Sequence, residues 1–168
     1  ALYPVYDLPG VFTKNTYPIA VNGSLTKINV SWNSFGSEGA KVFADALRVN
    51  GGLTSLDLSS NQLCGLDRYE GGTYTADGIT AIADALRVNG GLTKLSLAVN
   101  KLGEESTKAI CEALEQNTTL KELDINGDWQ CSNTGGSAGA KHVAKMVRVN
   151  GALTSVKLGG NKLGDEGW

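Results

Sequence analysis

The sequence of 168 residues is short of the residue types that build most catalytic sites. It has one histidine, three cysteines and one methionine. A single histidine, His142, excludes any metal or catalytic site that needs two, and its place beside Ala140 and Val143 favours a solvent-facing side chain. The sequence has neither a His-Glu zinc motif nor a serine nucleophile elbow. We therefore expect a protein that is not an enzyme, with no metal and no cofactor.

An excess of basic charge and a long apolar run are missing as well. Fifteen basic and seventeen acidic residues give a net charge of -2, which argues against nucleic acid as a partner. No apolar stretch approaches the roughly 20 residues that cross a bilayer, so we expect no transmembrane segment. The first residue is Ala rather than Met, which indicates a processed form or part of a longer chain.

Proline is confined to the start of the chain, at Pro4, Pro9 and Pro18. Proline at this density excludes a long helix, while four aromatic residues nearby argue against a fully disordered tail. Residues 1–24 are thus predicted to form an extended segment. It is either a cap that shields the apolar edge of the domain or an arm that lies on another subunit.

Repetition dominates the remainder of the chain. The eighteen residues from Ala44 to Asn61 recur almost unchanged from Ala83 to Asn100. Alignment on the first leucine of each unit gives starts at residues 25, 53, 92, 120 and 153. Two of the units are lengthened, and we place their insertions near residues 64–76 and 131–138. Segments repeated at this period are typical of a solenoid, in which equivalent units stack side by side.

Each unit carries two periodicities. Apolar residues two apart, at the fourth and sixth positions, predict a short strand with one buried face. Apolar residues at i, i+3, i+4 and i+7 then predict a helix, and Asn-Gly after the helix is expected to end it through a left-handed glycine. The ninth position predicts a ladder of side-chain amides at the strand ends. Its members are Asn33, Asn61, Asn100, Asp128 and Asn161.

The segments LTSLDLSSNQL, from Leu53, and LTKLSLAVNKL, from Leu92, resemble the leucine-rich repeat family, in particular its ribonuclease-inhibitor-like subclass of about 28 residues. The resemblance covers residues 25–168 and implies an α/β solenoid, or horseshoe, with a parallel β-sheet on the concave face and helices on the convex face. The amino-acid sequence of the repeats is also similar to that of repeat arrays common in unicellular algae. The last unit is incomplete.

The two lengthened units carry cysteines that align with glycines of the other units. Cys64 and Cys131 take the place of Gly36, Gly103 and Gly164. Because loops can close the distance between strands two units apart, we predict a disulfide between these two cysteines, with two free loop thiols as the alternative.

The irregular parts supply the candidate partner-binding residues, since the shared positions build the scaffold. Arg68, Tyr69 and Tyr74 lie in the first insertion and Trp129 beside the second, and these residue types are enriched in interfaces. The alternative is that the aromatic rings fold back on the scaffold. Trp32 is the best candidate on an otherwise small and polar concave face. Trp168, at the end, is predicted to contact a partner or further protein.

The leading hypothesis is a noncatalytic protein-protein interaction scaffold, an accessory subunit of a larger assembly such as a photosynthetic membrane complex. The alternatives are a ribonuclease-inhibitor-like inhibitor, the repeat fragment of an innate sensor, and a GTPase-activating protein. Other protein subunits are the expected partners, with peripheral association to a membrane complex. A plastid lumenal or extracellular location is favoured over a cytoplasmic one.

Overall fold

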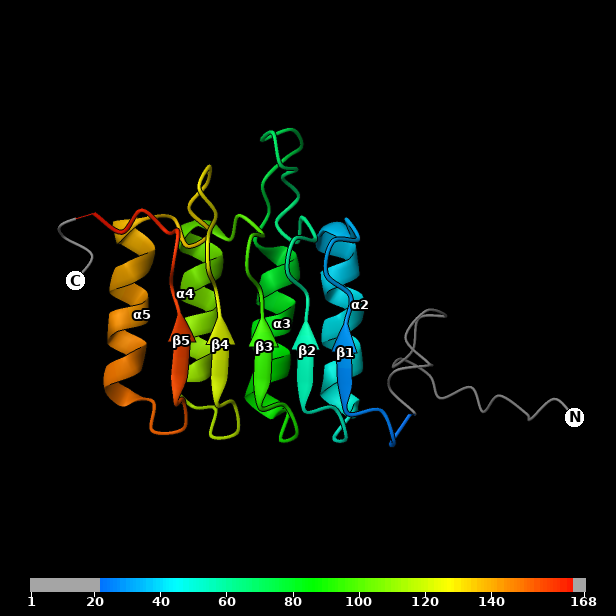
Figure 1. Ribbon diagram of the computed structural model, residues 1–168. Coiled ribbons are helices and arrows are strands. Elements are labelled where there is room, and N and C mark those ends of the chain that lie inside the picture. Colours follow the sequence, from blue (N-terminus) through cyan, green and yellow to red (C-terminus); the bar gives the residue numbers. More distant parts are fainter. Residues whose placement is uncertain (1–21, 165–168) are drawn as a thin grey trace, which may run out of the picture.

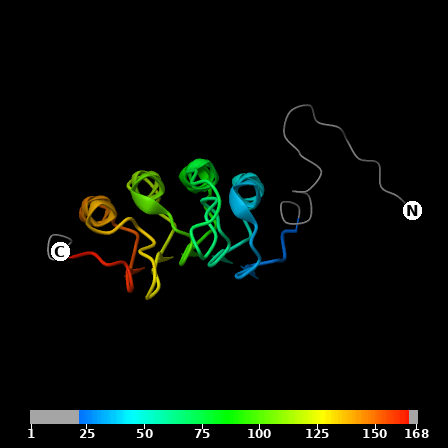
Figure 2. The same ribbon diagram turned by 90° about the horizontal axis from the view of Figure 1, so that it is seen from above.

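The computed structural model describes residues 22–164 as one curved solenoid. Five three-residue strands form a single parallel sheet in the order β1-β2-β3-β4-β5. Their bounds are β1 Lys27–Asn29, β2 Ser55–Asp57, β3 Lys94–Ser96, β4 Glu122–Asp124 and β5 Ser155–Lys157. Four helices alternate with them: α2 Gly36–Val49, α3 Asp77–Val88, α4 Gly103–Leu114 and α5 Ser137–Val149. Figure 2 shows the helices together on one side of the sheet. The predicted leucine-rich repeat solenoid is confirmed.

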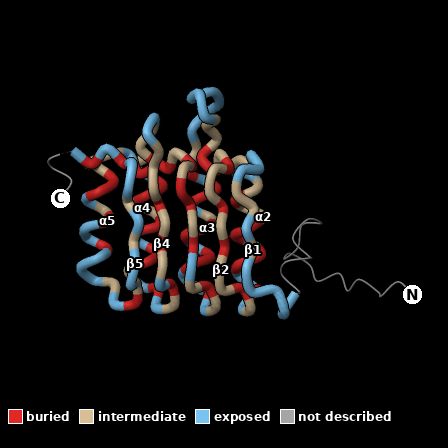
Figure 3. Tube along the Cα trace, viewed as in Figure 1, coloured by how far each residue is buried: buried red, intermediate tan, exposed pale blue. Residues whose placement is uncertain are grey.

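The strands pair in the register that the repeat alignment predicts. Leu56 pairs with Ile28 on one side and Leu95 on the other, and Leu123 and Val156 continue the row. The central members of this row are about 1–2% exposed, and the end members are only half-buried. Figure 3 shows the same gradient, with burial concentrated between strands and helices. The core is therefore one continuous row of leucines that weakens at both ends of the described chain.

The predicted helix faces are buried in α2, α3 and α4, but the last helix differs. In α5, Ala140 and Val143 are buried as expected, whereas Ala144 and Val147 are exposed and Met146 is buried instead. The equivalent Ala44 of α2 packs in the core between α2 and α3. No helix follows α5 in the described residues, so the side of α5 that carries Ala144 has no neighbour to bury it.

The Asn-Gly turns end the helices, but not through a left-handed glycine. The C-cap Asn89 is extended, with φ of -75° and ψ of 120°, and the φ of Gly90 lies outside the left-handed region. The side chain of Asn89 stabilises the turn instead: its Nδ2 donates to Leu47 O at 2.7 Å and its Oδ1 accepts from Leu92 N at 2.8 Å. Asparagines at equivalent places repeat this pattern, so the turn is a second amide ladder that ties each unit to the one before it.

The predicted amide ladder at the strand ends is present with one different member. Backbone N–H groups of Asn33, Asn61, Asn100 and Asn133 each donate to the side-chain oxygen of the next asparagine, at 2.8–2.9 Å, and the row ends at Asn161. The fourth unit thus contributes Asn133 rather than Asp128. A ladder member must also donate to carbonyl oxygens, and an aspartate has no N–H with which to do so.

Candidate interaction site at the loop rim

Both insertions rise from the same edge of the solenoid, the edge at which the strands end, which we call the loop rim (Figure 1). The first inserted loop, residues 65–75, lies between the ladder residue Asn61 and α3. The second inserted loop, residues 127–132, lies between β4 and Asn133. We predicted the second insertion near residues 131–138, and in the structure the extra residues directly precede the ladder asparagine Asn133.

The backbone at the loop rim is left-handed on both sides of the ladder asparagine in four of the five units. Trp32 has φ of 62° and Val99 has φ of 54°, and both directly precede a ladder asparagine. Gly160 occupies the same place in the fifth unit, with φ of 71°. A left-handed conformation costs an L-residue roughly 1–2 kcal/mol, and a bulky or β-branched side chain is rare there. Two large apolar side chains thus stand at positions where glycine folds more easily.

The first inserted loop is built around Asp67. Its Oδ1 accepts from the backbone N–H groups of Tyr69 and Gly71, both at 2.8 Å, and Leu66 bridges to Gly72 across the base of the loop. Tyr74 folds back onto the scaffold: it is 36% exposed, and its hydroxyl donates to Leu102 O at 2.7 Å. This position supports the structural alternative for Tyr74.

The second inserted loop is a compact turn around Asp128. One oxygen of its carboxylate accepts from Gln130 N at 2.9 Å and from Cys131 N at 2.7 Å. Asp128 N in turn donates to Cys131 O at 3.1 Å. The turn leaves Trp129 at its tip, 79% exposed.

The two inserted loops meet above the rim although they lie more than sixty residues apart in sequence. Arg68 Nε donates to Gln130 Oε1 at 3.5 Å. Lys101, which lies below them on the rim, donates to Arg68 O at 3.4 Å and lies 3.8 Å from the Glu70 carboxylate. These contacts hold the first inserted loop over the rim.

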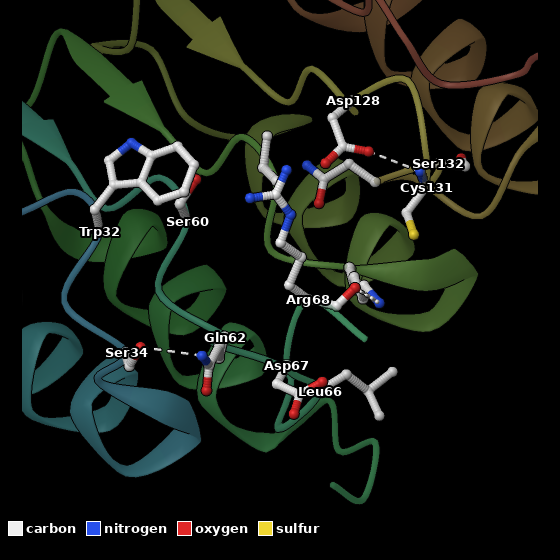
Figure 4. Close-up of a pocket in the computed structure, with 13 residues that line it drawn as sticks. Trp32, Ser34, Ser60, Gln62, Leu66, Asp67, Arg68, Asp128, Cys131 and Ser132 are labelled. Carbon is white, nitrogen blue, oxygen red and sulfur yellow. Dashed lines mark hydrogen bonds between the residues drawn. The ribbon is translucent and has the colours of Figure 1, made fainter. Parts of the chain in front are cut away.

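A groove, which we call the rim groove, lies between Trp32, the first inserted loop and the second inserted loop (Figure 4). Trp32 and the segment that holds Asp128 and Cys131 lie at its two ends, with Arg68 between them. Its volume is about 130 Å³, well below the roughly 300–1,000 Å³ of pockets for small molecules and cofactors. The groove suits side chains of a protein partner better than a whole cofactor.

Three of the predicted partner-binding aromatics are exposed at the loop rim. Trp32 is 71% exposed, Tyr69 is 88% exposed and Trp129 is 79% exposed. Trp32 and Arg68 line the groove, and Tyr69 and Trp129 stand on the two inserted loops. Trp168 and the predicted N-terminal segment up to residue 21 lie outside the described residues.

Several groove residues were not predicted from the sequence. Val99, Lys101, Ser60 and Gln62 also line the groove. They flank the ladder asparagines, at positions where the residue changes from unit to unit, so a comparison of the units position by position contains a signal for them.

The predicted disulfide is wrong. Cys64, Cys111 and Cys131 are free thiols. Cys64 is fully buried, with its Sγ 3.4 Å from Ser106 Oγ, and burial raises its pKa to about 11 while the Ser106 hydrogen bond opposes the rise. Cys131 lies in the second inserted loop. The two cysteines are not equivalent in the repeat, since Cys64 follows its ladder asparagine by three residues and Cys131 precedes Asn133 by two.

The described residues contain no group of three or more His, Cys, Asp or Glu side chains that could hold a metal ion. His142 lies 3.4 Å from the Glu104 carboxylate at the surface of α5 and α4. None of the helices in the described part of the chain is long and apolar enough to cross a membrane.

Comparisons with known proteins agree with the fold. Two family models of leucine-rich repeats match residues 21–44 and 152–167, and residues 52–70. The human "NACHT, LRR and PYD domains-containing protein 13" is 33% identical over 147 residues, which is 87% of this chain and 13% of that protein. The solved structure of "Leiomodin-1 Actin-Binding Site 2 (ABS2)" superposes with a TM-score of 0.71 at 23% identity, over 90% of this chain and 80% of that chain.

The chain thus spans a small part of the curated relative that it matches, and its likeness to the leiomodin structure concerns the fold. The expected likeness to algal arrays and the plastid or extracellular location stay predictions. The matched repeats, the five parallel strands and the alternating helices together identify the chain as a leucine-rich repeat protein.

Proposed function

We propose that this chain is a noncatalytic protein-interaction module, an accessory subunit of a larger assembly, and that it contacts its partner through the rim groove and the two inserted loops. The observation that carries the proposal is a groove lined by the exposed Trp32 and bordered by two inserted loops that each carry a further exposed aromatic residue, Tyr69 and Trp129. Tryptophan and tyrosine dominate the residues that supply most binding energy in protein interfaces.

Backbone strain at the groove supports the same reading. Trp32 and Val99 occupy left-handed positions that folding alone does not favour. Strained residues of this kind cluster at binding sites, where the side chain is retained for its contacts rather than for the stability of the fold. Contacts between the two inserted loops, which the other units lack, border the groove.

The concave face is the weaker candidate. Four of its charged side chains form ion pairs across neighbouring strands, with Lys94 Nζ 2.6 Å from Glu122 and Lys157 Nζ 3.3 Å from Asp124. Charges that neutralise one another leave few groups for a partner, and the face has few aromatic residues. Trp32 stands at the rim end of this face.

A second candidate function is the repeat region of an innate sensor. The 33% identity to the human NACHT, LRR and PYD protein favours it over the inhibitor and GTPase-activating alternatives. On this hypothesis, the full reading frame encodes further repeats and a nucleotide-binding domain. A photosynthetic membrane complex is one concrete assembly for the leading proposal, and plastid import of the full-length product tests that version.

The proposal is tested by size-exclusion chromatography and chemical cross-linking in extracts of the native source. The unaltered chain is expected to elute in an assembly much larger than its 17.6 kDa mass. A double variant, Trp32→Ala with Trp129→Ala, should elute as a free monomer. The matched control is Val49→Ala with Val88→Ala, which removes side chains that are 50% and 69% exposed at helix ends. A free monomer for the unaltered chain contradicts the proposal.

A further inference from the structure

In the rim groove the hydrogen-bond acceptors are mostly paired, whereas several donors are not. Asp67 and Asp128 are its two carboxylates, and each already accepts two backbone N–H groups of its own loop at 2.7–2.9 Å. Such bonds stabilise the charged carboxylate and satisfy much of its capacity to accept. The two acids therefore serve mainly to shape the loops.

The donors of the groove are less occupied. The guanidinium of Arg68 donates one hydrogen bond, at 3.5 Å through Nε, and forms no ion pair within the described part of the chain. Its guanidinium has further N–H donors arranged in a fork that fits a carboxylate. Within the same residues the indole N–H of Trp32 and the hydroxyl of Ser60 have no hydrogen-bond partner. A ligand that supplies acceptors fits this surface better than one that supplies donors.

The apolar part of the groove lies beside these donors. Trp32, Val99 and Leu66 line it, and Trp32 and Val99 come from the first and third units. From the first unit to the fourth the groove crosses three strand spacings, which is about 14 Å at roughly 4.8 Å each. An extended peptide rises about 3.3 Å per residue, so about four residues span this distance. Alternate residues of such a peptide point to the same face.

We propose that the rim groove binds an extended acidic segment of a partner protein, with a carboxylate at Arg68 and an apolar side chain about two residues away against Trp32 and Val99. This inference rests on the proposed function and names the chemistry of the partner. The guanidinium of Arg68 binds the carboxylate of the segment, and the side chain of Trp32 supplies the apolar contact.

The test uses fluorescence anisotropy with three labelled twelve-residue peptides that share alternating leucines. Between the leucines the first peptide has glutamate, the second glutamine and the third lysine. The glutamate peptide is expected to bind about tenfold more tightly than the glutamine peptide, because a hydrogen-bonded charge contributes more than a neutral group. The substitution Arg68→Gln should abolish this difference, whereas Arg48→Gln on the exposed surface of α2 should preserve it.

Every other outcome overturns the inference. Equal binding of the three peptides, tighter binding of the lysine peptide, or an unchanged preference in the Arg68→Gln protein contradicts an acidic ligand. Self-association of the chain detected by light scattering, lost in Arg68→Gln, assigns the groove to a second copy instead. Absence of peptide binding, together with loss of the native assembly in the tryptophan variants, ends the inference while the proposed function stands. Retention of the assembly by those variants ends the proposed function independently.

Discussion

The strand-end ladder makes the strongest energetic prediction, because one substitution should have very different effects at two equivalent positions. Asn100 lies in the middle of the ladder and is 1% exposed, whereas Asn33 lies at its exposed end. Replacement of either asparagine by alanine removes the same chemical groups. The difference between the two variants therefore isolates what the surrounding units contribute.

At Asn100 the side-chain oxygen accepts from Asn61 N at 2.8 Å and from Leu63 N at 3.3 Å, and both donors are buried. The Asn100→Ala variant leaves these two N–H groups without a partner. Each unsatisfied buried group costs about 1–3 kcal/mol, so the loss of two acceptor bonds should lower the free energy of unfolding by about 2–6 kcal/mol. The carbonyl oxygens to which Asn100 Nδ2 donates retain other donors, which limits the loss.

At Asn33 the side-chain oxygen accepts from no described residue, and Nδ2 donates to Val30 O at 2.9 Å and Ser31 O at 3.0 Å near solvent. Water replaces these bonds in the Asn33→Ala variant, so the expected loss is below about 1 kcal/mol. Urea denaturation followed by circular dichroism measures both values. If the two variants lie within about 1 kcal/mol of each other, the asparagines do not form the energetic ladder described here.

Two further predictions concern the packing of single residues. The Gly135→Ala variant should lose about 2–4 kcal/mol of stability, because the φ of Gly135 is 81° and an added Cβ would lie 2.6 Å from Glu104 N. The control variant Gly51→Ala should be near neutral, since nothing lies within 4 Å of an added Cβ there. Equal melting temperatures for the two variants would contradict the close approach at Gly135. In iodoacetamide labelling at pH 8, Cys131 should react first and the buried Cys64 and Cys111 much more slowly, because burial raises their pKa values to about 11 and about 12. A pKa of about 11 leaves only about one Cys64 thiol in a thousand ionised, so mass spectrometry that finds Cys64 labelled before Cys131 contradicts its burial.

Much of the fold could be predicted because a repeat records each structural rule several times. The leucines at the first, fourth and sixth positions predicted five strands, and the observed register from Ile28 to Val156 follows the same alignment. The exposure of Ala144 and Val147 could not be read from the helical spacing. It depends on whether another helix covers that side of α5, which is a property of the neighbours rather than of the segment.

The fourth unit shows what the alignment alone could not decide. Asp128 stands at the ninth position by count, and Asn133 stands there only if the extra residues are placed before it. The ladder requires a group that both accepts and donates, which an aspartate cannot be. This chemical requirement would have moved the insertion, removed the apparent equivalence of Cys64 and Cys131, and with it the predicted disulfide.

The exposed aromatic residues of the candidate site could be picked out from the sequence. The way in which the two inserted loops pack together could not. The spacing of the loops did not show that Arg68 would meet Gln130 or that Tyr74 would turn inward to Leu102. Both depend on how the inserted loops pack on the rim. The strain at Trp32 is visible only from the backbone conformation.

The most direct test of the interaction module combines stability and assembly in one variant, Trp32→Asn. Asparagine tolerates the left-handed backbone, so relief of roughly 1 kcal/mol of strain should offset the small burial of the indole and leave the free energy of unfolding within about 1 kcal/mol of the unaltered chain. We expect the large assembly seen by size-exclusion chromatography to dissociate in the same protein. A variant that is clearly destabilised, or that stays assembled, contradicts the conclusion that Trp32 is kept for a partner.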